Sequence, residues 1–274
     1  MPESLQLRVH HPEVRPALVH LPGLHGDWTL LGPFRRALGG RACLVETTYP
    51  RRPDWRLDDY AAAMDGALAE RGLREGWVLA ESFSSQVGWQ WVARQLDRPE
   101  TTGFRLLGLI LVGGFIRHSW PWGVRACRLA SAAGPPWLRD RLCSLYTRGP
   151  QTRDPAGAED FREFVRRRLV PADRDAITQR YRLIADTDLR PVARRARLPV
   201  YHLSGAWDPL VPWPLVRAWL RRECPGYRAS RIVRQGGHNV LLSAADISAE
   251  QILEWVTASP STAPLDRPQI RSTS

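Results

Sequence analysis

Three side chains that together could make a nucleophile lie far apart in the sequence, and each follows a short apolar run typical of a strand. They are Ser82, Asp208 and His238. A serine hydroxyl is a weak nucleophile at neutral pH, and it needs a base that a third group orients. We therefore expect Ser82 to attack a substrate, His238 to take its proton, and Asp208 to orient the imidazole.

Ser82 stands in the stretch WVLAESFSSQ, where an apolar run passes directly into a helical pattern. A tight turn between a strand and a helix projects the serine above the sheet, and its usual sequence is Gly-x-Ser-x-Gly. Ala80 and Ser84 fill the two glycine positions, and both are small enough for the turn. Ser84 and Ser85 fall in the first helical turn, which favours a capping or packing role for them.

Asp208 and His238 also have ordinary interpretations. Asp208 precedes Pro209, as turn residues and helix caps commonly do. His238 follows two glycines, as a histidine in a surface loop could. Their order after Ser82, at the ends of successive predicted strands, favours the catalytic interpretation. Among the other histidines, His25 is the only competing candidate for the base.

Two backbone N–H groups are expected to hold the negative charge that forms on the substrate oxygen. One belongs to Phe83, directly after the nucleophile, and the other to Leu24, in the loop after the predicted strand 17–21. Gly23 precedes Leu24 and lets the backbone approach closely. The sequence therefore predicts an oxyanion hole made by the amides of Leu24 and Phe83.

The elements that must position these groups alternate between strand and helix over most of the chain. Strands are predicted at 5–9, 17–21, 42–45, 77–80, 106–112, 199–203 and 230–234, and helices at 28–38, 57–71, 83–96, 213–222 and 246–257. Such alternation predicts an α/β fold, with a mostly parallel sheet that has helices on both faces. The site is then expected beyond the carboxyl ends of the strands.

One long segment interrupts this alternation. Residues 116–198 carry amphipathic helical patterns and no strand pattern, so we expect a helical cap inserted into a core made of 1–115 and 199–257. Residues 258–274 are rich in Ser, Thr and Pro, and are expected to be a disordered tail because they can bury little apolar surface.

Tryptophan is abundant, with 12 residues, and two of them stand at the start of the cap. These two, Trp120 and Trp122, are candidates for lining an acyl pocket, although packing within the cap explains them equally well. Trp89, Trp91 and Trp207 are expected in the core.

Four segments in sequence order resemble the α/β-hydrolase fold superfamily: HLPGLHGD, AESFSS, LSGAWDPLVP and GGHNVLLS. The resemblance covers about residues 16–257, and it is closest to esterase-like and lipase-like members whose nucleophile elbow reads ESFSG. It implies a sheet of eight or slightly fewer strands, and hydrolysis of an ester or related acyl bond. It also implies the roles given above for Ser82, Asp208, His238, Leu24 and Phe83. The departure is a serine, at position 85, where such elbows have glycine.

The charge of the chain is strongly positive, and all 39 basic residues are arginine against 28 acidic ones, a net charge of +11. Residues 121–198 hold 17 of the arginines against 9 acidic residues. We expect an arginine-rich solvated face, and the alternative is a surface that attracts an acidic carrier protein. No nucleic acid partner, metal or organic cofactor is expected.

The remaining composition restricts the cell compartment and the chemistry. No apolar stretch approaches the roughly 20 residues of a membrane helix, and no secretory signal begins the chain, so a cytoplasmic location is expected. The four cysteines are widely spaced, which favours free thiols.

Three functions remain open from the sequence. The first is a carboxylesterase that acts on a small-molecule acyl ester. The second is an acyl-thioester hydrolase or acyltransferase that uses the same three residues on a carrier-bound acyl group. The third is a binding protein with the hydrolase fold and no catalysis.

Overall fold

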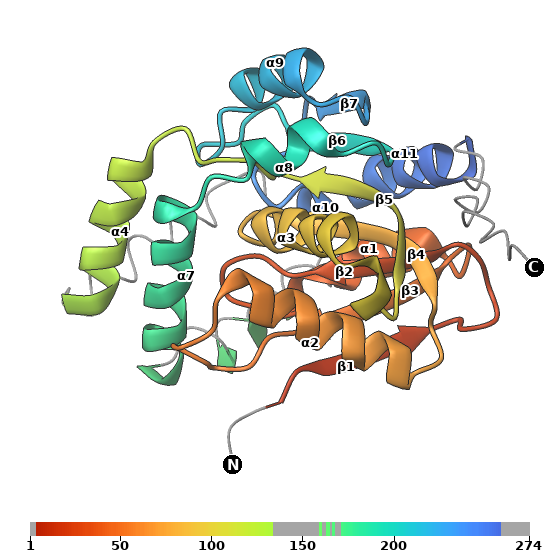
Figure 1. Cartoon of the computed structure of the whole chain (residues 1–274), viewed down its shortest axis with the longest axis horizontal. Coiled ribbons are helices and arrows are strands. Elements are labelled where there is room, and N and C mark those ends of the chain that lie inside the picture. Colours follow the sequence, from red (N-terminus) through yellow and green to blue (C-terminus); the bar gives the residue numbers. More distant parts are fainter. Residues whose placement is uncertain (1–3, 134–158, 161–162, 165, 168–170, 259–274) are drawn as a thin grey trace, which may run out of the picture.

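The sheet has seven strands in the order β1-β3-β2-β4-β5-β6-β7 (Figure 1). The structure is a computed structural model, and it describes residues 4–133, 159–160, 163–164, 166–167 and 171–258. The strands are β1 Gln6–His10, β2 Ala17–Leu21, β3 Cys43–Thr48, β4 Glu75–Glu81, β5 Arg105–Val112, β6 Val200–Gly205 and β7 Tyr227–Val233. β1 pairs antiparallel with β3, and all the other pairs are parallel. The predicted mostly parallel sheet is therefore confirmed.

Helices connect the strands and cover both faces of the sheet. They are α1 Gly32–Leu38, α2 Leu57–Glu70, α3 Ser84–Asp97, α4 Pro121–Ala133, α7 Arg174–Asp186, α8 Arg190–Arg195, α9 Trp213–Glu223, α10 Val240–Ser243 and α11 Ala245–Ala258, with short 3-10 turns at Thr29–Leu31, Pro99–Thr101 and Pro171–Asp173. The five predicted helices are confirmed, the first as a 3-10 turn followed by α1. The sequence did not predict α8 and α10, because six and four residues are too few to display a helical period.

Side chains alternate between the two faces of the sheet, as the period of a strand requires. On β2, Val19 packs into the core under α2 and α3, while Leu18 packs into the core that α1, α10 and α11 cover. On β4, Val78 and Leu79 divide in the same way. Both faces are thus buried, which explains why these strands read as continuous apolar runs.

The chain reverses its direction of travel across the sheet between β2 and β4. β3 lies on one side of β2, and β4 lies on the other. β2 and β4 are neighbours in the sheet, but the chain leaves their carboxyl ends in opposite directions. Such a position is a topological switch point, where open α/β sheets usually bind ligands. Leu24 lies in the first of these loops and Ser82 in the second.

The predicted cap is described only in part. Within the described residues of 116–198 the structure contains helices and no strand, and α4 packs beside α7 at one end of the molecule (Figure 1). Residues 134–158 of the cap and 259–274 of the predicted tail lie outside the described residues. α11 continues through the first tail residue, Ala258, and the division into domains stays a prediction.

Three further predictions concern single residues. Trp89 and Trp91 on α3 are fully buried, as expected, but Trp207 is 72% exposed, so its prediction as a core residue was wrong. Its amide donates to the carbonyl of Gly236 at 3.1 Å, which turns the backbone toward the β7 loop and leaves the ring outside. Cys43, Cys127 and Cys224 are free thiols, and Cys143 lies outside the described residues.

The described helices of the protein are short or carry many polar residues. None in the described part of the chain combines the length and the hydrophobicity that crossing a bilayer requires.

Candidate active site

Ser82 occupies the turn between β4 and α3. Its φ is +50°, in the left-handed region that residues other than glycine seldom adopt, and its amide donates to the carbonyl of Val112 at 2.9 Å. β4 ends at Glu81 and α3 begins at Ser84, so only two residues make the connection. This is the tight strand-to-helix turn that the sequence predicts for a nucleophile.

The structure brings Ser82, His238 and Asp208 into one chain of hydrogen bonds. Nε2 of His238 lies 2.8 Å from Oγ of Ser82, and Nδ1 of His238 lies 2.8 Å from Oδ2 of Asp208. The side chains of His238 and Asp208 are buried, with exposed fractions of 2% and 0%, while Ser82 is partly accessible. The arrangement therefore gives the serine an oriented base and an opening to solvent.

The loops after β6 and β7 are bonded to each other, which brings Asp208 to His238. The amide of Ala206 donates to the carbonyl of Val233 at 2.9 Å. A Cβ added to Gly205 would lie 2.2 Å from the carbonyl oxygen of Gly237, so this close approach requires glycine.

The carboxylate of Asp208 is held in place by both of its oxygens. Oδ2 accepts from His238, while Oδ1 accepts from the amides of Leu210 and Val211, both at 2.9 Å. Burial acts to raise the pKa of Asp208, but the charge of His238 and these hydrogen bonds outweigh it, so the pKa lies below its usual range. Asp208 is thus ionised at neutral pH.

Burial acts in the opposite direction on His238. It alone would lower the pKa of the imidazole, but the charge of Asp208 and its hydrogen bond raise the pKa above its ordinary value, with a smaller contribution from Glu81. Asp208 therefore stabilises the protonated imidazole, the state that a general base reaches after it takes a proton.

Gly113, at the end of β5, lies directly behind this pair. Its φ is +52°, and an added Cβ would lie 2.9 Å from the carbonyl oxygen of His238 and 3.5 Å from Oδ2 of Asp208. The pair Gly113-Gly114 in the sequence could have indicated this close approach, but the sequence analysis did not use it.

Two of the three positions where this turn departs from glycine, Ala80 and Ser85, are each matched by a glycine on a neighbouring segment. An added Cβ on Gly88 would lie 3.1 Å from Cβ of Ala80, and one on Gly114 would lie 2.9 Å from Cβ of Ser85. The side chains that replace glycine in the turn thus occupy space that Gly88 and Gly114 leave free. Gly114 therefore leaves room for the side chain of Ser85.

The hydroxyls of Ser84 and Ser85 bond to neighbouring groups and take no part in the hydrogen bonds that join Ser82, His238 and Asp208. Ser84 donates to the carbonyl of Pro22 and lies 2.7 Å from the hydroxyl of Tyr49. Ser85 donates to the carbonyl of Ser82 at 2.6 Å and accepts from the amide of Phe115 at 3.0 Å. Both residues therefore hold the turn in place, in the packing role expected of them.

The two predicted oxyanion amides lie in buried loops on either side of the switch point. Leu24 is 9% exposed and Phe83 is fully buried. Among the hydrogen bonds of the described residues, none is donated by the backbone N–H of Leu24 or Phe83. Ser84 connects the two loops, because it follows Phe83 and bonds to Pro22.

Arg180, in the predicted cap, holds the Leu24 loop in place, and no feature of the sequence predicted this role. Arg180, on α7, is fully buried, and its guanidinium donates to the carbonyls of Leu24 at 2.8 Å and Pro50 at 3.1 Å and to the hydroxyl of Tyr60 at 3.1 Å. An added Cβ on Gly26 would lie 2.8 Å from this guanidinium. No short motif marks such a contact, because most of its acceptors are backbone oxygens.

The other sequence candidates lie elsewhere. His25 is buried and packs edge-on against Phe164, with ring centroids 5.1 Å apart. Trp120 and Trp122 are 47% and 73% exposed, and their role in an acyl pocket stays a prediction. In the described part of the chain, no group of three or more His, Cys, Asp or Glu side chains is arranged to hold a metal ion.

Comparison with solved structures identifies the fold. An esterase from Exiguobacterium antarcticum aligns with a TM-score of 0.75 at 14% identity, over 93% of this chain and 96% of its own. The chain has the α/β-hydrolase fold. The seven-stranded, mostly parallel sheet agrees with the fold that the resemblance implies, and Ser82, Asp208 and His238 each follow a strand, as the sequence predicts.

Other proteins with this fold differ in activity. The enol-lactonase from Burkholderia xenovorans LB400 aligns with a TM-score of 0.72 at 19% identity, over 92% of this chain and 96% of its own. A bromoperoxidase from Bacillus anthracis aligns with a TM-score of 0.73 at 13% identity, over 92% and 95%. No family model matches the sequence, and no curated protein sequence matches it. The function must therefore be argued from the site itself.

Proposed function

We propose that the protein is a serine hydrolase that cleaves a carboxylic ester through an acyl-enzyme. The observation that carries the proposal is the continuous hydrogen-bond chain from Ser82 through His238 to Asp208, with both contacts at 2.8 Å. Nucleophile and base lie within hydrogen-bond reach, and the base is oriented by a buried carboxylate, as this chemistry requires.

The proposed reaction has two halves. As Oγ of Ser82 attacks the ester carbonyl, Nε2 of His238 takes its proton, and the amides of Leu24 and Phe83 hold the oxyanion. His238 then gives the proton to the leaving alcohol, and the acyl group stays on Ser82. Water, deprotonated by His238, releases the acid and restores the hydroxyl. No step requires a metal or an organic cofactor.

The Ser82→Ala variant tests the nucleophile. It is expected to lose hydrolysis of a short p-nitrophenyl ester by at least about 10⁴-fold, because the attacking oxygen is absent. A fluorophosphonate probe is expected to label the natural chain at Ser82 and to leave the variant unlabelled. Circular dichroism and the melting temperature of the variant check that the fold is kept.

Ser131→Ala, on α4, is the matched control, and it should be labelled and active like the natural chain. If Ser82→Ala turned over the ester at the same rate as the natural chain, the nucleophile assignment would be wrong. If neither chain reacted with the probe or with any ester, a binding protein with this fold would be the better account.

A second candidate is an acyl-thioester hydrolase or acyltransferase that uses the same residues on an acyl group attached to an acidic carrier protein. The observation that favours it is an excess of positive charge on the exposed face of α4 and α7. Arg125 and Arg182 both face Asp186, at 3.0 and 3.9 Å, and their side chains are 55% and 64% exposed. Two guanidinium groups thus share one carboxylate there, which would attract an acidic partner.

Salt distinguishes the two candidates. If a carrier docks on these arginines, kcat/KM for a carrier-bound thioester should fall at least about tenfold between 50 and 500 mM NaCl, whereas that for a small neutral ester should change little. Arg125→Gln/Arg182→Gln should remove most of this salt dependence. A carrier preference that is unchanged by salt and by the double variant would contradict the docking of a carrier through arginine.

A further inference from the structure

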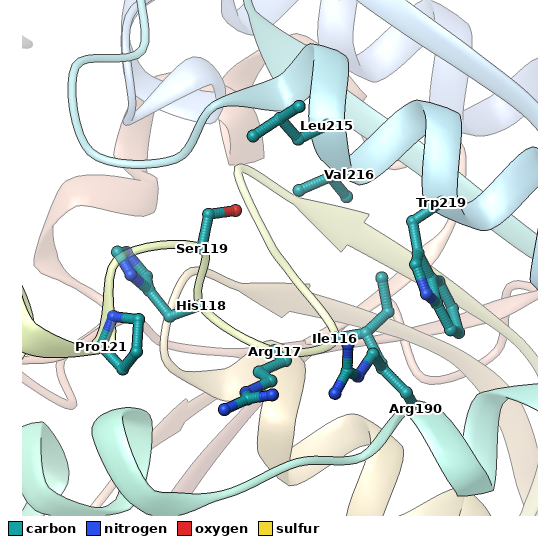
Figure 2. Close-up of a pocket in the computed structure, with 9 residues that line it drawn as sticks. All are labelled: Ile116, Arg117, His118, Ser119, Pro121, Arg190, Leu215, Val216 and Trp219. Atoms are coloured by element: carbon teal, nitrogen blue, oxygen red, sulfur yellow. The ribbon is translucent and has the colours of Figure 1, made fainter.

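A cavity of about 360 Å³ opens between the predicted cap and the core, and Figure 2 shows the residues that line it. Its wall combines the linker from β5 to α4, the first residue of α8, and one side of α9. The lining residues are Ile116, Arg117, His118, Ser119, Pro121, Arg190, Leu215, Val216 and Trp219. The volume falls within the range of sites that bind small molecules.

The charged groups in this wall are all positive. Arg117 and Arg190 both line the cavity, and none of the nine lining residues is acidic. The two guanidiniums share one carboxylate outside the lining, that of Asp188, at 3.5 Å from Arg117 and 2.5 Å from Arg190. Hydrogen bonds from Arg190 are the largest cause of a lowered pKa of Asp188, so this carboxylate is ionised. Among the described residues, Arg117 and Arg190 thus have one carboxylate between them for two positive charges.

Glu223, the acidic residue of α9, does not neutralise this excess of positive charge. Glu223 lies 3.0 Å from Arg194 and 2.8 Å from Arg222, so two further arginines already share it. The neighbourhood of the cavity thus keeps an excess of guanidinium over carboxylate, and arginine is well suited to bind carboxylate or phosphate through two hydrogen bonds.

The opposite side of the cavity is apolar. Leu215, Val216 and Trp219 project from α9, and Arg117 and Arg190 lie across from them in Figure 2. Leu215 is 58% exposed, so its apolar side chain is accessible to a ligand in the cavity. A ligand with one acidic end and one apolar body would match both sides.

The linker that lines the cavity begins beside the candidate active site, because an added Cβ on Gly113, three residues before Ile116, would lie 2.9 Å from the carbonyl oxygen of His238. Burial lowers the pKa of His118, while a hydrogen bond to the backbone of Leu210 opposes this effect, and the charges of His238 and Asp208 also act on it. The amide of Leu210 in turn donates to Asp208. His118 therefore stands between the cavity and the residue that orients His238.

We propose that this cavity binds the acidic half of the substrate, a carboxylate or phosphate joined to an aryl or branched alkyl body, with Arg117 and Arg190 on the acid and Leu215, Val216 and Trp219 on the body. The proposal rests on the proposed ester hydrolysis for its role as a substrate site, but the binding of the acidic group does not depend on catalysis.

Direct binding is the first test. Calorimetry on the natural chain should show 4-phenylbutyrate binding at least about tenfold more tightly than the neutral 4-phenylbutyramide, since only the acid can pair with the guanidiniums. Phenyl phosphate, in a parallel titration, separates a preference for phosphate from one for carboxylate. Arg117→Gln/Arg190→Gln should bind the acid and the amide equally.

The matched control removes two arginines elsewhere. Arg52 and Arg105 are each paired with one acid, Asp54 and Glu75, and are 37% and 46% exposed, so Arg52→Gln/Arg105→Gln removes the same charge without touching the cavity. This control should keep the preference for the acid. An equal loss in both double variants, or no preference in the natural chain, would overturn the proposal.

Kinetics then separate the cavity from the proposed function. Mono-p-nitrophenyl glutarate against p-nitrophenyl valerate tests an acid on the acyl side, and 4-acetoxybenzoate against 4-acetoxybenzamide tests one on the alcohol side. In one of these pairs, Arg117→Gln/Arg190→Gln should raise KM for the acidic ester about tenfold while leaving the neutral ester unchanged. Acid binding without any ester turnover would contradict the proposed function alone, whereas turnover with no charge-dependent KM would contradict the substrate role of the cavity.

Discussion

The backbone of Ser82 carries a cost that its neighbours must offset. A left-handed conformation costs a residue with a Cβ about 1–2 kcal/mol. The amide of Ser82 bonds to Val112, and its carbonyl accepts from the amide and the hydroxyl of Ser85. The turn is thus held on both sides, and it keeps the hydroxyl of Ser82 beside His238 instead of relaxing into a regular strand end.

The pH dependence of the reaction follows from the pair His238 and Asp208. The base must be neutral to take a proton, so kcat/KM should fall as the pH drops through the pKa of His238, which lies above its ordinary value of about 6.5. Asp208→Asn removes the charge that stabilises the imidazolium, so the acid limb should move to lower pH. The rate should also fall about 10⁴-fold, because the imidazole is no longer held in the tautomer that can accept the proton of Ser82. A pH profile of kcat/KM for each chain measures both effects.

Asp54→Asn is the control for this shift, because Asp54 is an exposed carboxylate whose partner is Arg52. Its acid limb should coincide with that of the natural chain. If Asp208→Asn left the limb where it was, or moved it to higher pH, the carboxylate would not be acting on His238.

At the scale of elements, the alternation of strands and helices could be predicted because the inner strands, β2 to β6, are buried on both faces and each long helix shows its own period. The site residues could be proposed for the same reason: Ser82, Asp208 and His238 each follow a strand that the sequence makes visible. The close packing of Ala80 against Gly88 could not be predicted in this way. It joins β4 to α3, and only the packed structure defines the distance between these elements. A search limited to Gly-x-Ser-x-Gly would have passed over this turn.

The loops were less accessible to prediction than the elements. Trp207 was expected in the core on its residue type, but its position is set by the bond between its amide and Gly236, which is a property of the loop backbone. The cavity was missed for a similar reason. Arg117, Arg190 and Trp219 come from a linker, a short helix and the side of α9, and no local pattern connects them.

At the scale of the whole molecule, a buried cation joins the predicted cap to the predicted core. Arg180 is a cap residue by sequence, yet its guanidinium bonds to Leu24 and Pro50 in two loops of the core, and its ring neighbours are Tyr49 and Tyr60. Burying a guanidinium is costly unless its donors are satisfied, so the three hydrogen bonds make the position of α7 and that of the Leu24 loop depend on each other.

Arg180→Met removes this coupling while keeping an unbranched, flexible side chain that can fill part of the buried space. Three buried acceptors then lose a donor, so the variant should lose about 2–4 kcal/mol of unfolding free energy in urea denaturation. Because the Leu24 loop also loses its support, kcat for a p-nitrophenyl ester should fall about 10- to 100-fold, with KM less affected.

Arg182→Gln, on the same helix but 64% exposed, is the control and should stay within about 0.5 kcal/mol of the natural chain. A stable Arg180→Met with unchanged kcat would mean that the Leu24 loop holds its position without the cap. A destabilised variant that kept its kcat at low temperature would limit Arg180 to a structural role.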